Sequence, residues 1–175
     1  MARFFLALWP PPGARPQLAA LAADLARRCG GRAVPTDKVH LTLAFLGEID
    51  AGGVARASEV AAAVAAPALE LRFDRAGSFP GARVAWAGMS QPDRDATSLA
   101  TELSTRLRDA GFAIDRRPIV LHATLARRVA RPLAEAPVET IAWAADRFAL
   151  VESDLRTGRY MEKGSWKLGG KEGAR

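Results

Sequence analysis

Val39-His40-Leu41-Thr42-Leu43-Ala44-Phe45-Leu46-Gly47 holds one of only two histidines in this 175-residue chain, and the other lies in a matching stretch, Leu121-His122-Ala123-Thr124-Leu125-Ala126-Arg127. Each histidine is followed by threonine two positions later and by leucine three positions later. Side chains two apart on a β-strand point to the same face, so each stretch predicts a strand with a polar His/Thr face and an apolar face. We expect Phe45 on the apolar face, together with Leu41 and Leu43.

The rest of the chain predicts further strands and three helices. Apolar residues three or four apart indicate helices, and alternating or short continuous apolar runs indicate strands. We expect strands at 4–9, 32–35, 39–46, 69–74, 83–87, 119–126, 143–151 and 159–168, and helices at 16–29, 50–66 and between Pro92 and Gly111. Residues 77–81 predict a turn-rich connection, and 127–137 predict a loop.

Both halves of the chain follow one order: a strand, a helix and then the His-x-Thr strand. We therefore expect an α+β fold that is bilobal, with β-α-β units duplicated about a pseudo-two-fold axis and mainly antiparallel sheets lining a central cleft. A parallel, doubly wound sheet is the alternative, which the alternating strands and the consecutive final pair disfavour. We expect residues 1–170 to form a single two-lobed domain and 171–175 a mobile tail.

The composition indicates a folded protein in a reducing compartment. Hydrophobic residues make up 49% of the chain and charged residues 25%, which suits a buried core. The single cysteine, Cys29, excludes an internal disulfide and lies on the apolar stripe of a predicted helix. The apolar run from Phe4 to Trp9 is short for a signal peptide, and no run approaches membrane-spanning length. We expect a cytoplasmic monomer without membrane contact.

The net charge of +6 and the pI of about 10.4 permit a polyanionic partner such as RNA. However, 21 of the 25 basic residues are arginine, a bias that a GC-rich genome alone can produce. Arg116, Arg117, Arg128 and Arg131 flank the second motif. A guide for an RNA strand and a solvated basic loop are both compatible with this cluster.

Two histidines and two threonines on facing polar strand faces suit phosphoester hydrolysis. Imidazoles with an ordinary pKa near 6.5 can serve as acid and base at neutral pH. The hydroxyls of Thr42 and Thr124 can donate to non-bridging phosphate oxygens, where negative charge must be held. Arg127 is the nearest cation, although strict alternation places it on the apolar face unless the strand has ended or bulged by then.

Other chemistries find little support. Two histidines and a distant cysteine leave too few ligands for a metal site, so we expect none. The chain contains no Gly-x-Ser-x-Gly motif and no glycine-rich loop of the P-loop or dinucleotide-binding type. The paired motifs therefore remain the candidate site.

The two motifs, His-Leu-Thr-Leu-x-Phe-Leu-Gly and His-x-Thr-Leu-Ala-Arg, resemble those of the two-histidine (2H) phosphoesterase superfamily. They are most similar to the bacterial and archaeal RNA 2′,3′-cyclic phosphodiesterases, long called 2′-5′ RNA ligases. The resemblance extends over the Phe-Phe-x-Ala opening strand, Gly77 to Trp86 and a closing strand around Tyr160. It implies a bilobal α+β fold that hydrolyses RNA 2′,3′-cyclic phosphate ends to 2′-phosphomonoesters without metal or cofactor, with possible reversible 2′-5′ ligation.

Residue roles follow from the same resemblance. It implies that His40 is the proton donor to the leaving 3′ oxygen and that His122 is the proton acceptor that activates water. Thr42, Thr124 and Arg127 would bind the phosphate. The residues alone do not separate the two histidines, because the pseudo-symmetry makes them interchangeable.

Two alternatives stay open. One is a two-histidine phosphodiesterase acting on a 2′-5′ linkage or a small cyclic nucleotide, and the other is a weakly active RNA-end-binding protein. The intact histidine pair favours an enzyme. Ala123 departs from the family pattern, which often has a larger apolar residue there; we expect this to change packing on the apolar face and not the chemistry.

Overall fold

The computed structural model describes residues 2–169. The strands in this range are β1 (Ala2–Leu8), β2 (Arg32–Ala33), β3 (Leu41–Gly47), β4 (Leu69–Phe79), β5 (Val84–Gly88), β6 (His122–Arg127), β7 (Ala136–Ala145), β8 (Arg147–Asp154) and β9 (Tyr160–Lys167). The helices are α1 (Arg15–Cys29), α2 (Ala51–Ala62) and α3 (Arg94–Asp109), with short 3₁₀ turns η1 (Pro12–Ala14) and η2 (Thr36–Lys38). The expected tail at 171–175 lies outside the described residues.

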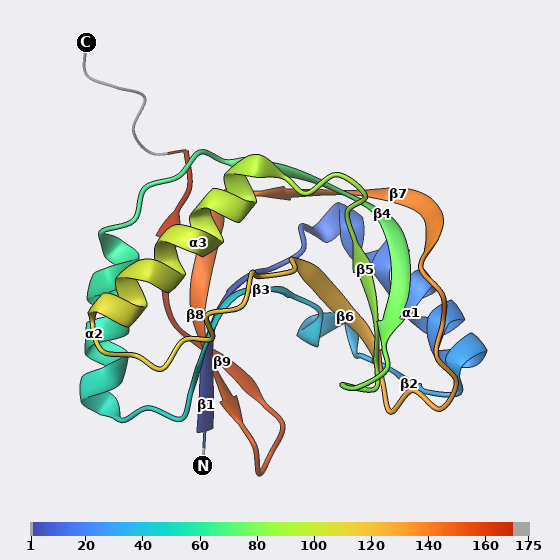
Figure 1. Cartoon of the computed structure of the whole chain (residues 1–175), viewed down its shortest axis with the longest axis horizontal. Coiled ribbons are helices and arrows are strands. Elements are labelled where there is room, and N and C mark those ends of the chain that lie inside the picture. The colour runs from blue at the N-terminus through green and yellow to red at the C-terminus, as the bar shows by residue number, and fades with distance from the viewer. Residues whose placement is uncertain (1, 170–175) are drawn as a thin grey trace.

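The strands form one sheet in the order β7-β4-β5-β6-β3-β1-β8-β9, and β2 pairs with β6 (Figure 1). Every strand pairing within residues 2–169 is antiparallel. The predicted α+β fold with antiparallel sheets is confirmed, and the parallel alternative is wrong.

The sheet consists of two four-stranded halves, β7-β4-β5-β6 and β3-β1-β8-β9, which meet at a single pair of residues, Leu41 and Ala123. These two residues follow His40 and His122, so they are equivalent positions of the two motifs. An antiparallel pair of equivalent residues places the pseudo-two-fold axis between them. Both side chains are fully buried, so Ala123 is a feature of packing, as expected.

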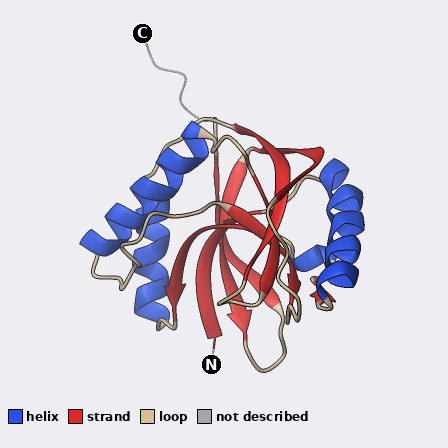
Figure 2. Ribbon diagram, turned by 45° about the vertical axis from the view of Figure 1, so that its right-hand side comes forward, coloured by secondary structure: helices blue, strands red, loops and turns tan. Residues whose placement is uncertain are grey.

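Each long crossover helix packs on the half of the sheet opposite to the strand it follows. Helix α1 follows β1 but packs against β6, β2 and β5, and α3 follows β5 but packs against β3. Figure 2 shows α1 on one flank of the strands and α2 with α3 on the other. The two halves are therefore tied together by these crossings as well as by the central pair.

Local signals account for the helix ends. Asp50 and Asp93 accept hydrogen bonds from the backbone N–H groups of Gly53 and Ala96, at 2.7 and 2.8 Å, and so cap α2 and α3. Gly30 ends α1 in the left-handed conformation, with φ of 65°.

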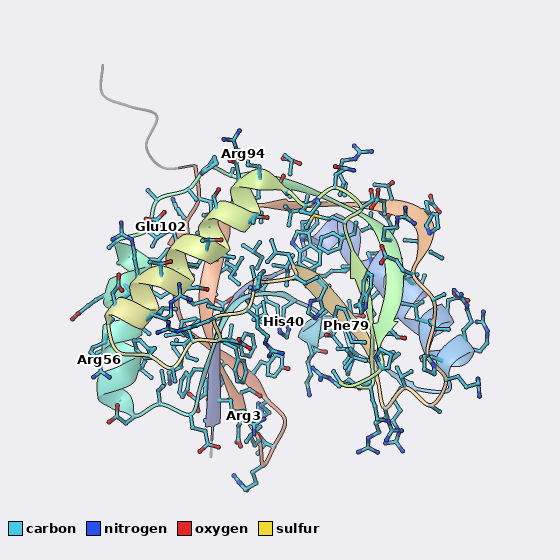
Figure 3. The ribbon with its side chains drawn as sticks, in the orientation of Figure 1. Arg3, His40, Arg56, Phe79, Arg94 and Glu102 are labelled. Atoms are coloured by element: carbon cyan, nitrogen blue, oxygen red, sulfur yellow. The ribbon has the colours of Figure 1, made fainter. Side chains whose placement is uncertain are left out.

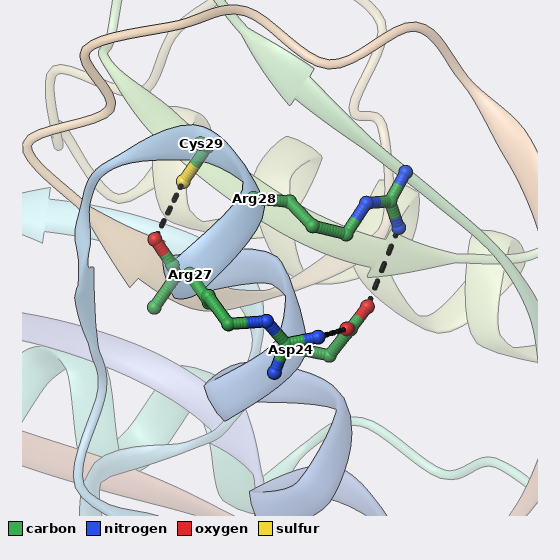
Figure 4. Close-up of polar contacts among 5 residues, drawn as sticks. Asp24, Arg27, Arg28 and Cys29 are labelled. Atoms are coloured by element: carbon green, nitrogen blue, oxygen red, sulfur yellow. Dashed lines mark hydrogen bonds and ion pairs between the residues drawn. The ribbon is translucent and has the colours of Figure 1, made fainter.

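The last turn of α1 carries the only cysteine of the chain (Figure 4). The Cys29 Sγ lies 3.8 Å from the carbonyl oxygen of Ala26, and its side chain is fully buried. Asp24 pairs on the exposed side with Arg27 and, at 3.4 Å, with Arg28. The expected packing role of Cys29 is confirmed.

Several predicted boundaries are wrong. The run 143–151 is divided at Asp146 into β7, which pairs with β4, and β8, which pairs with β1 and β9. The expected connection 77–81 belongs to β4 as far as Phe79, because Gly77 serves there to admit the Trp86 indole and not to turn the chain. Helix α2 ends at Ala62, four residues early. No helix in residues 2–169 is both long and apolar enough to cross a membrane.

Candidate active site

A β-bulge in each motif strand changes the alternation of side chains. On β3 the pairing with β1 jumps from Leu6↔Ala44 to Ala7↔Thr42, so Leu43 is the extra residue, and Leu43 and Ala44 are both buried. After a bulge the two faces exchange. Phe45 therefore lies on the same face as Thr42, is 52% exposed and lines a cavity with it. The prediction that Phe45 lies on the apolar face is wrong for this reason.

The second motif bulges at the equivalent residue. The pairing of β6 with β5 jumps from Ala85↔Ala126 to Trp86↔Thr124, which makes Leu125 the extra residue. Arg127 is thereby brought onto the face of Thr124, and both line the same cavity. The bulge resolves the conflict between strict alternation and a phosphate-binding role for Arg127.

Antiparallel pairing about Leu41 and Ala123 sets the two motifs against each other. In the antiparallel register, the residue before Leu41 is opposite the residue after Ala123, and the reverse holds on the other side of the pair. His40 is therefore opposite Thr124, and Thr42 is opposite His122. Each histidine thus has the threonine of the other motif as its neighbour across the axis. The four predicted side chains are brought together from positions up to 84 residues apart.

A cavity of about 650 Å³ opens at this junction. Its size falls in the range of small-ligand sites in proteins. The walls include His40, Thr42, Thr124 and Arg127, but His122 is not among the lining residues. Among residues 2–169, the lining cations are Arg3, Arg32, Lys38, Arg127 and Arg128, and the single lining carboxylate is that of Asp154. The cavity is therefore cationic and suited to an anionic ligand.

The two histidines make the same local hydrogen bond. His40 Nδ1 lies 2.7 Å from the carbonyl oxygen of Lys38, and His122 Nδ1 lies 2.7 Å from that of Val120. A carbonyl oxygen can only accept, so Nδ1 carries hydrogen in both rings. Nε2 is consequently the nitrogen left to take or give a proton, which is the arrangement an acid–base pair requires.

Aromatic side chains surround His40. The Phe5 ring is stacked on the His40 ring with centroids 4.6 Å apart, and the Trp9 and Tyr160 rings meet it at steep angles, with centroids at 5.7 and 5.6 Å. Lys38 lies over the Tyr160 ring, 5.9 Å from its centroid. These contacts fix the plane of the imidazole and exclude water from much of it.

His122 also packs against an aromatic pair, Phe79 and Trp86, and two glycines make room for the Trp86 ring. Phe79 meets the His122 ring edge to face, with centroids 5.0 Å apart, and stacks on the Trp86 ring at 5.3 Å. A Cβ on Gly77 would lie 2.8 Å from the Trp86 indole, and one on Gly88 would lie 3.0 Å from it. The absence of side chains at these two positions makes room for Trp86, and through it for Phe79.

The aromatic walls were not anticipated from the sequence. One signal was available: Phe5 and Trp9 occupy odd positions of the first strand, on one face, while Leu6 and Leu8 occupy the other. Phe79 lies in the segment 77–81, which predicts a turn-rich connection, and Tyr160 has no periodic neighbour. Only the three-dimensional pairing of strands places them at the histidines.

Burial dominates the electrostatics of both imidazoles. Desolvation lowers the pKa of His40 to about 4, partly opposed by the hydrogen bond to Lys38 and reinforced by the charges of Arg127 and His122. Desolvation also lowers the pKa of His122, against its hydrogen bond to Val120. Both rings are therefore neutral at pH 7 in the free protein, and a bound phosphate anion would favour the charged form of either.

The basic residues flanking the second motif divide into two groups. Arg128 lines the cavity. Arg117 pairs with Asp115 on the exposed surface, Arg131 donates to the carbonyl of Arg28 at 3.2 Å, and Arg116 is not among the cavity-lining residues. Of the four arginines considered from sequence, only Arg128 is in a position to touch a ligand in the cavity.

The chain is similar to known proteins over nearly its whole length. The model of the family described as LigT like phosphoesterase matches residues 8–86. A protein of Escherichia coli (strain K12) named RNA 2′,3′-cyclic phosphodiesterase is 33% identical over 169 residues, which cover 95% of this chain and 96% of that protein. One of the same name from Archaeoglobus fulgidus is 29% identical over 128 residues, covering 71% of this chain and 72% of that protein.

The fold is shared with solved structures of proteins from E. coli and Thermus thermophilus. The crystal structure of E. coli LigT complexed with 3′-AMP superposes with a TM-score of 0.87 at 33% identity, covering 95% of this chain and 97% of that chain. A crystal structure of a Thermus thermophilus protein superposes with a TM-score of 0.83 at 25% identity, covering 97% of this chain and 100% of that chain. With a relative 33% identical across nearly its whole length, this chain belongs to the LigT-like phosphoesterase family of enzymes, the two-histidine family that its motifs resemble.

Proposed function

We propose that this protein hydrolyses RNA 2′,3′-cyclic phosphate ends to 2′-phosphomonoesters by acid–base catalysis with two histidines and without a metal ion. The observation that carries the proposal is the meeting of two His-x-Thr units across the pseudo-two-fold axis, at a cleft lined by five cations. The relative from E. coli (strain K12) bears the name of this activity, and the similar structure of E. coli LigT was determined with a nucleotide, 3′-AMP.

The chemistry requires two proton transfers on opposite sides of phosphorus. His122 Nε2 takes a proton from water as the water oxygen bonds to phosphorus, and His40 Nε2 gives a proton to O3′ as the P–O3′ bond breaks. The hydroxyls of Thr42 and Thr124 and the Arg127 guanidinium hold the non-bridging oxygens. The products are a 2′-phosphomonoester and a free 3′-hydroxyl, with one proton moved through each imidazole.

The environment of His40 adds a condition to its role as donor. With a pKa of about 4 in the free protein, it must gain its proton together with the anionic substrate. The phosphate charge favours this, and so does the Phe5 ring stacked on the imidazole, because an aromatic face attracts a cation. We therefore expect substrate binding and protonation of His40 to be coupled.

The direct test is incubation of the protein with a short RNA ending in a 2′,3′-cyclic phosphate, in the presence of EDTA. The expected product is an RNA with a 2′-phosphate and a 3′-hydroxyl, identified by resistance or sensitivity to end-specific phosphatases. No product, a 3′-phosphate product, or turnover only after metal is added would contradict the proposal. A 2′-5′-linked dinucleotide and a 3′,5′-cyclic nucleotide, run in parallel, test the two alternative substrates.

A further inference from the structure

The lip of the cleft at the end of β6 carries three neighbouring arginines, Arg32, Arg127 and Arg128. Arg32 on β2 is paired directly with Arg127 on β6, and Arg128 is the next residue along the chain. All three are exposed and line the cavity. The role proposed above, binding of the reacting phosphate, uses only Arg127.

This arrangement is unfavourable without an anion. Like charges directly opposite each other on paired strands destabilise a sheet. The six ion pairs within residues 2–169 include none of the three arginines, so no carboxylate offsets their repulsion. By contrast, neighbouring Arg83 and Arg131 donate to backbone carbonyls, of Val129 at 3.1 Å and of Arg28 at 3.2 Å.

Arg128 also occupies a strained backbone position. Its φ of 58° lies in the left-handed region, where glycine is favoured over any residue with a side chain. A long charged side chain there is held at the cavity wall at a cost to the folded state. Strain of this kind gathers at sites that bind ligands.

We propose that Arg32 and Arg128 bind the phosphodiester on the 5′ side of the terminal nucleotide, so that the enzyme recognises an RNA strand and not only its cyclic end. This inference rests on the proposed function. In the proposed function, the two histidines, the two threonines and Arg127 contact the cyclic phosphate. The next anion along an RNA strand is the preceding phosphodiester. Arg32 and Arg128 adjoin Arg127 on one lip, which puts two further cations directly beside the residue assigned to the reacting phosphate.

The opposite side of the cleft is less suited to a second phosphate. Lys38 is held over the Tyr160 ring, and Arg3 lies on β1 beside the β8 end that carries Asp154. The Asp154 carboxylate accepts hydrogen bonds from the Thr157 hydroxyl and the Arg156 backbone N–H, which lower its pKa and keep it charged. A phosphodiester placed there would meet this negative charge.

The test compares two substrates that differ by the preceding nucleoside and its phosphodiester: a nucleoside 2′,3′-cyclic phosphate with a free 5′-hydroxyl, and a dinucleotide ending in the same cyclic phosphate. For Arg32→Gln and Arg128→Gln we expect KM for the dinucleotide to rise about tenfold each, the loss of one charge-assisted contact, with kcat unchanged. KM for the mononucleotide should stay within about twofold of the original protein, since it lacks the phosphate in question.

Two further variants serve as controls for the roles given to Arg32 and Arg128. Arg128→Gly removes the side chain and relieves the strained φ, so it should match Arg128→Gln in KM while being at least as stable. Arg94→Gln removes the same charge at the start of α3, away from the cleft (Figure 3). This variant should leave KM and kcat unchanged for both substrates. For each arginine variant, kcat/KM for the dinucleotide should depend less steeply on salt concentration than it does for the original protein.

Equal losses on both substrates would overturn the inference, because they would assign the arginines to the reacting phosphate. No loss on either would also overturn it and leave a solvated basic lip. If the original protein turned over neither substrate, the proposed function would fail separately. The affinities of the same variants for the dinucleotide 2′-phosphate, measured by titration calorimetry, would then decide the role of the arginines.

Discussion

His40 and His122 share the same hydrogen-bond geometry but differ in surroundings. The ring of His40 is stacked on Phe5 and enclosed by Trp9 and Tyr160, whereas His122 has Phe79 at its edge. The difference breaks the pseudo-symmetry that makes the two histidines equivalent in sequence. An aromatic face stabilises an imidazolium once it forms, which suits His40 as the residue that holds the proton before transfer.

Replacing either histidine by alanine should lower kcat by roughly 100-fold or more, the usual contribution of general acid–base catalysis. The pH profile of the residual activity separates the two roles. Activity falls at low pH because the acceptor becomes protonated, and at high pH because the donor loses its proton. His40→Ala should therefore lose the high-pH fall and keep the low-pH one, and His122→Ala the reverse. The opposite pattern would exchange the two roles.

The coupling of His40 protonation to substrate binding should be visible in the original protein. The profile of kcat/KM reports the free enzyme, in which the His40 pKa is lowered to about 4, and that of kcat reports the enzyme–substrate complex. If the bound phosphate raises the pKa of His40, the high-pH fall should lie at lower pH in kcat/KM than in kcat. Coincident falls would show that the substrate does not change the charge of the donor.

The buried His40 also makes stability depend on pH. The unfolded chain takes up a proton here near pH 6.5, whereas the folded chain does so only near pH 4. The unfolded state binds more protons between these values, so the free energy of unfolding should fall as pH falls through this window, by about 3 kcal/mol. Urea unfolding at pH 7 and pH 4 measures the loss. His40→Gln, which keeps a donor for the Lys38 carbonyl, should show a smaller loss; an equal loss would assign it to other groups.

At the scale of the strand, the bulges at Leu43 and Leu125 decide what faces the cleft. Each exchanges the two faces one residue after the His-x-Thr unit, so equivalent positions present Phe45 in one half and Arg127 in the other. The cleft thereby receives an exposed aromatic side chain from one lobe and a guanidinium from the other. A duplicated element thus yields an asymmetric site.

The strand pair β4–β5 positions His122 through Trp86 and Phe79, which pack where glycine leaves room for the indole. Gly77→Ala would place a Cβ 2.8 Å from the Trp86 indole, which must then shift Phe79 against the His122 ring. We expect the unfolding free energy to fall by about 1–3 kcal/mol, as for other overpacked sites, and kcat to fall several-fold. Gly81→Ala, where a Cβ meets nothing within 4 Å, is the matched control and should be neutral in both. Unchanged kcat in Gly77→Ala would remove Trp86 and Phe79 from the positioning of His122.

On the scale of the molecule, the two half-sheets share a single residue pair, yet α1 and α3 each cross from one half to the other. We therefore propose that the described chain unfolds as one cooperative domain. Leu103→Ala in α3, a fully buried side chain, should cost about 2–5 kcal/mol and shift the whole transition. Circular dichroism and tryptophan fluorescence should report one coincident midpoint in both proteins. Separate midpoints would show that the lobes unfold independently.

Much of the fold and the site could be predicted from the sequence because the signals were local. The two His-x-Thr-Leu units and the apolar stripes of the helices each depend on neighbours within a few residues. The same limit explains the errors: nothing local distinguishes the break at Asp146 within an apolar run, or shows that Gly77 accommodates an indole 9 residues away.

By itself the sequence determined which residues we propose for the chemistry, since two histidines with matching threonines are the only set in the sequence suited to it. The tertiary structure alone decided how they act together. It set Leu41 against Ala123 on the axis, turned Phe45 and Arg127 into the cleft by a bulge, and enclosed His40 in aromatic rings. Register, bulges and burial arise from pairing between strands far apart in the chain, and alternation along a single strand contains no information about its partner.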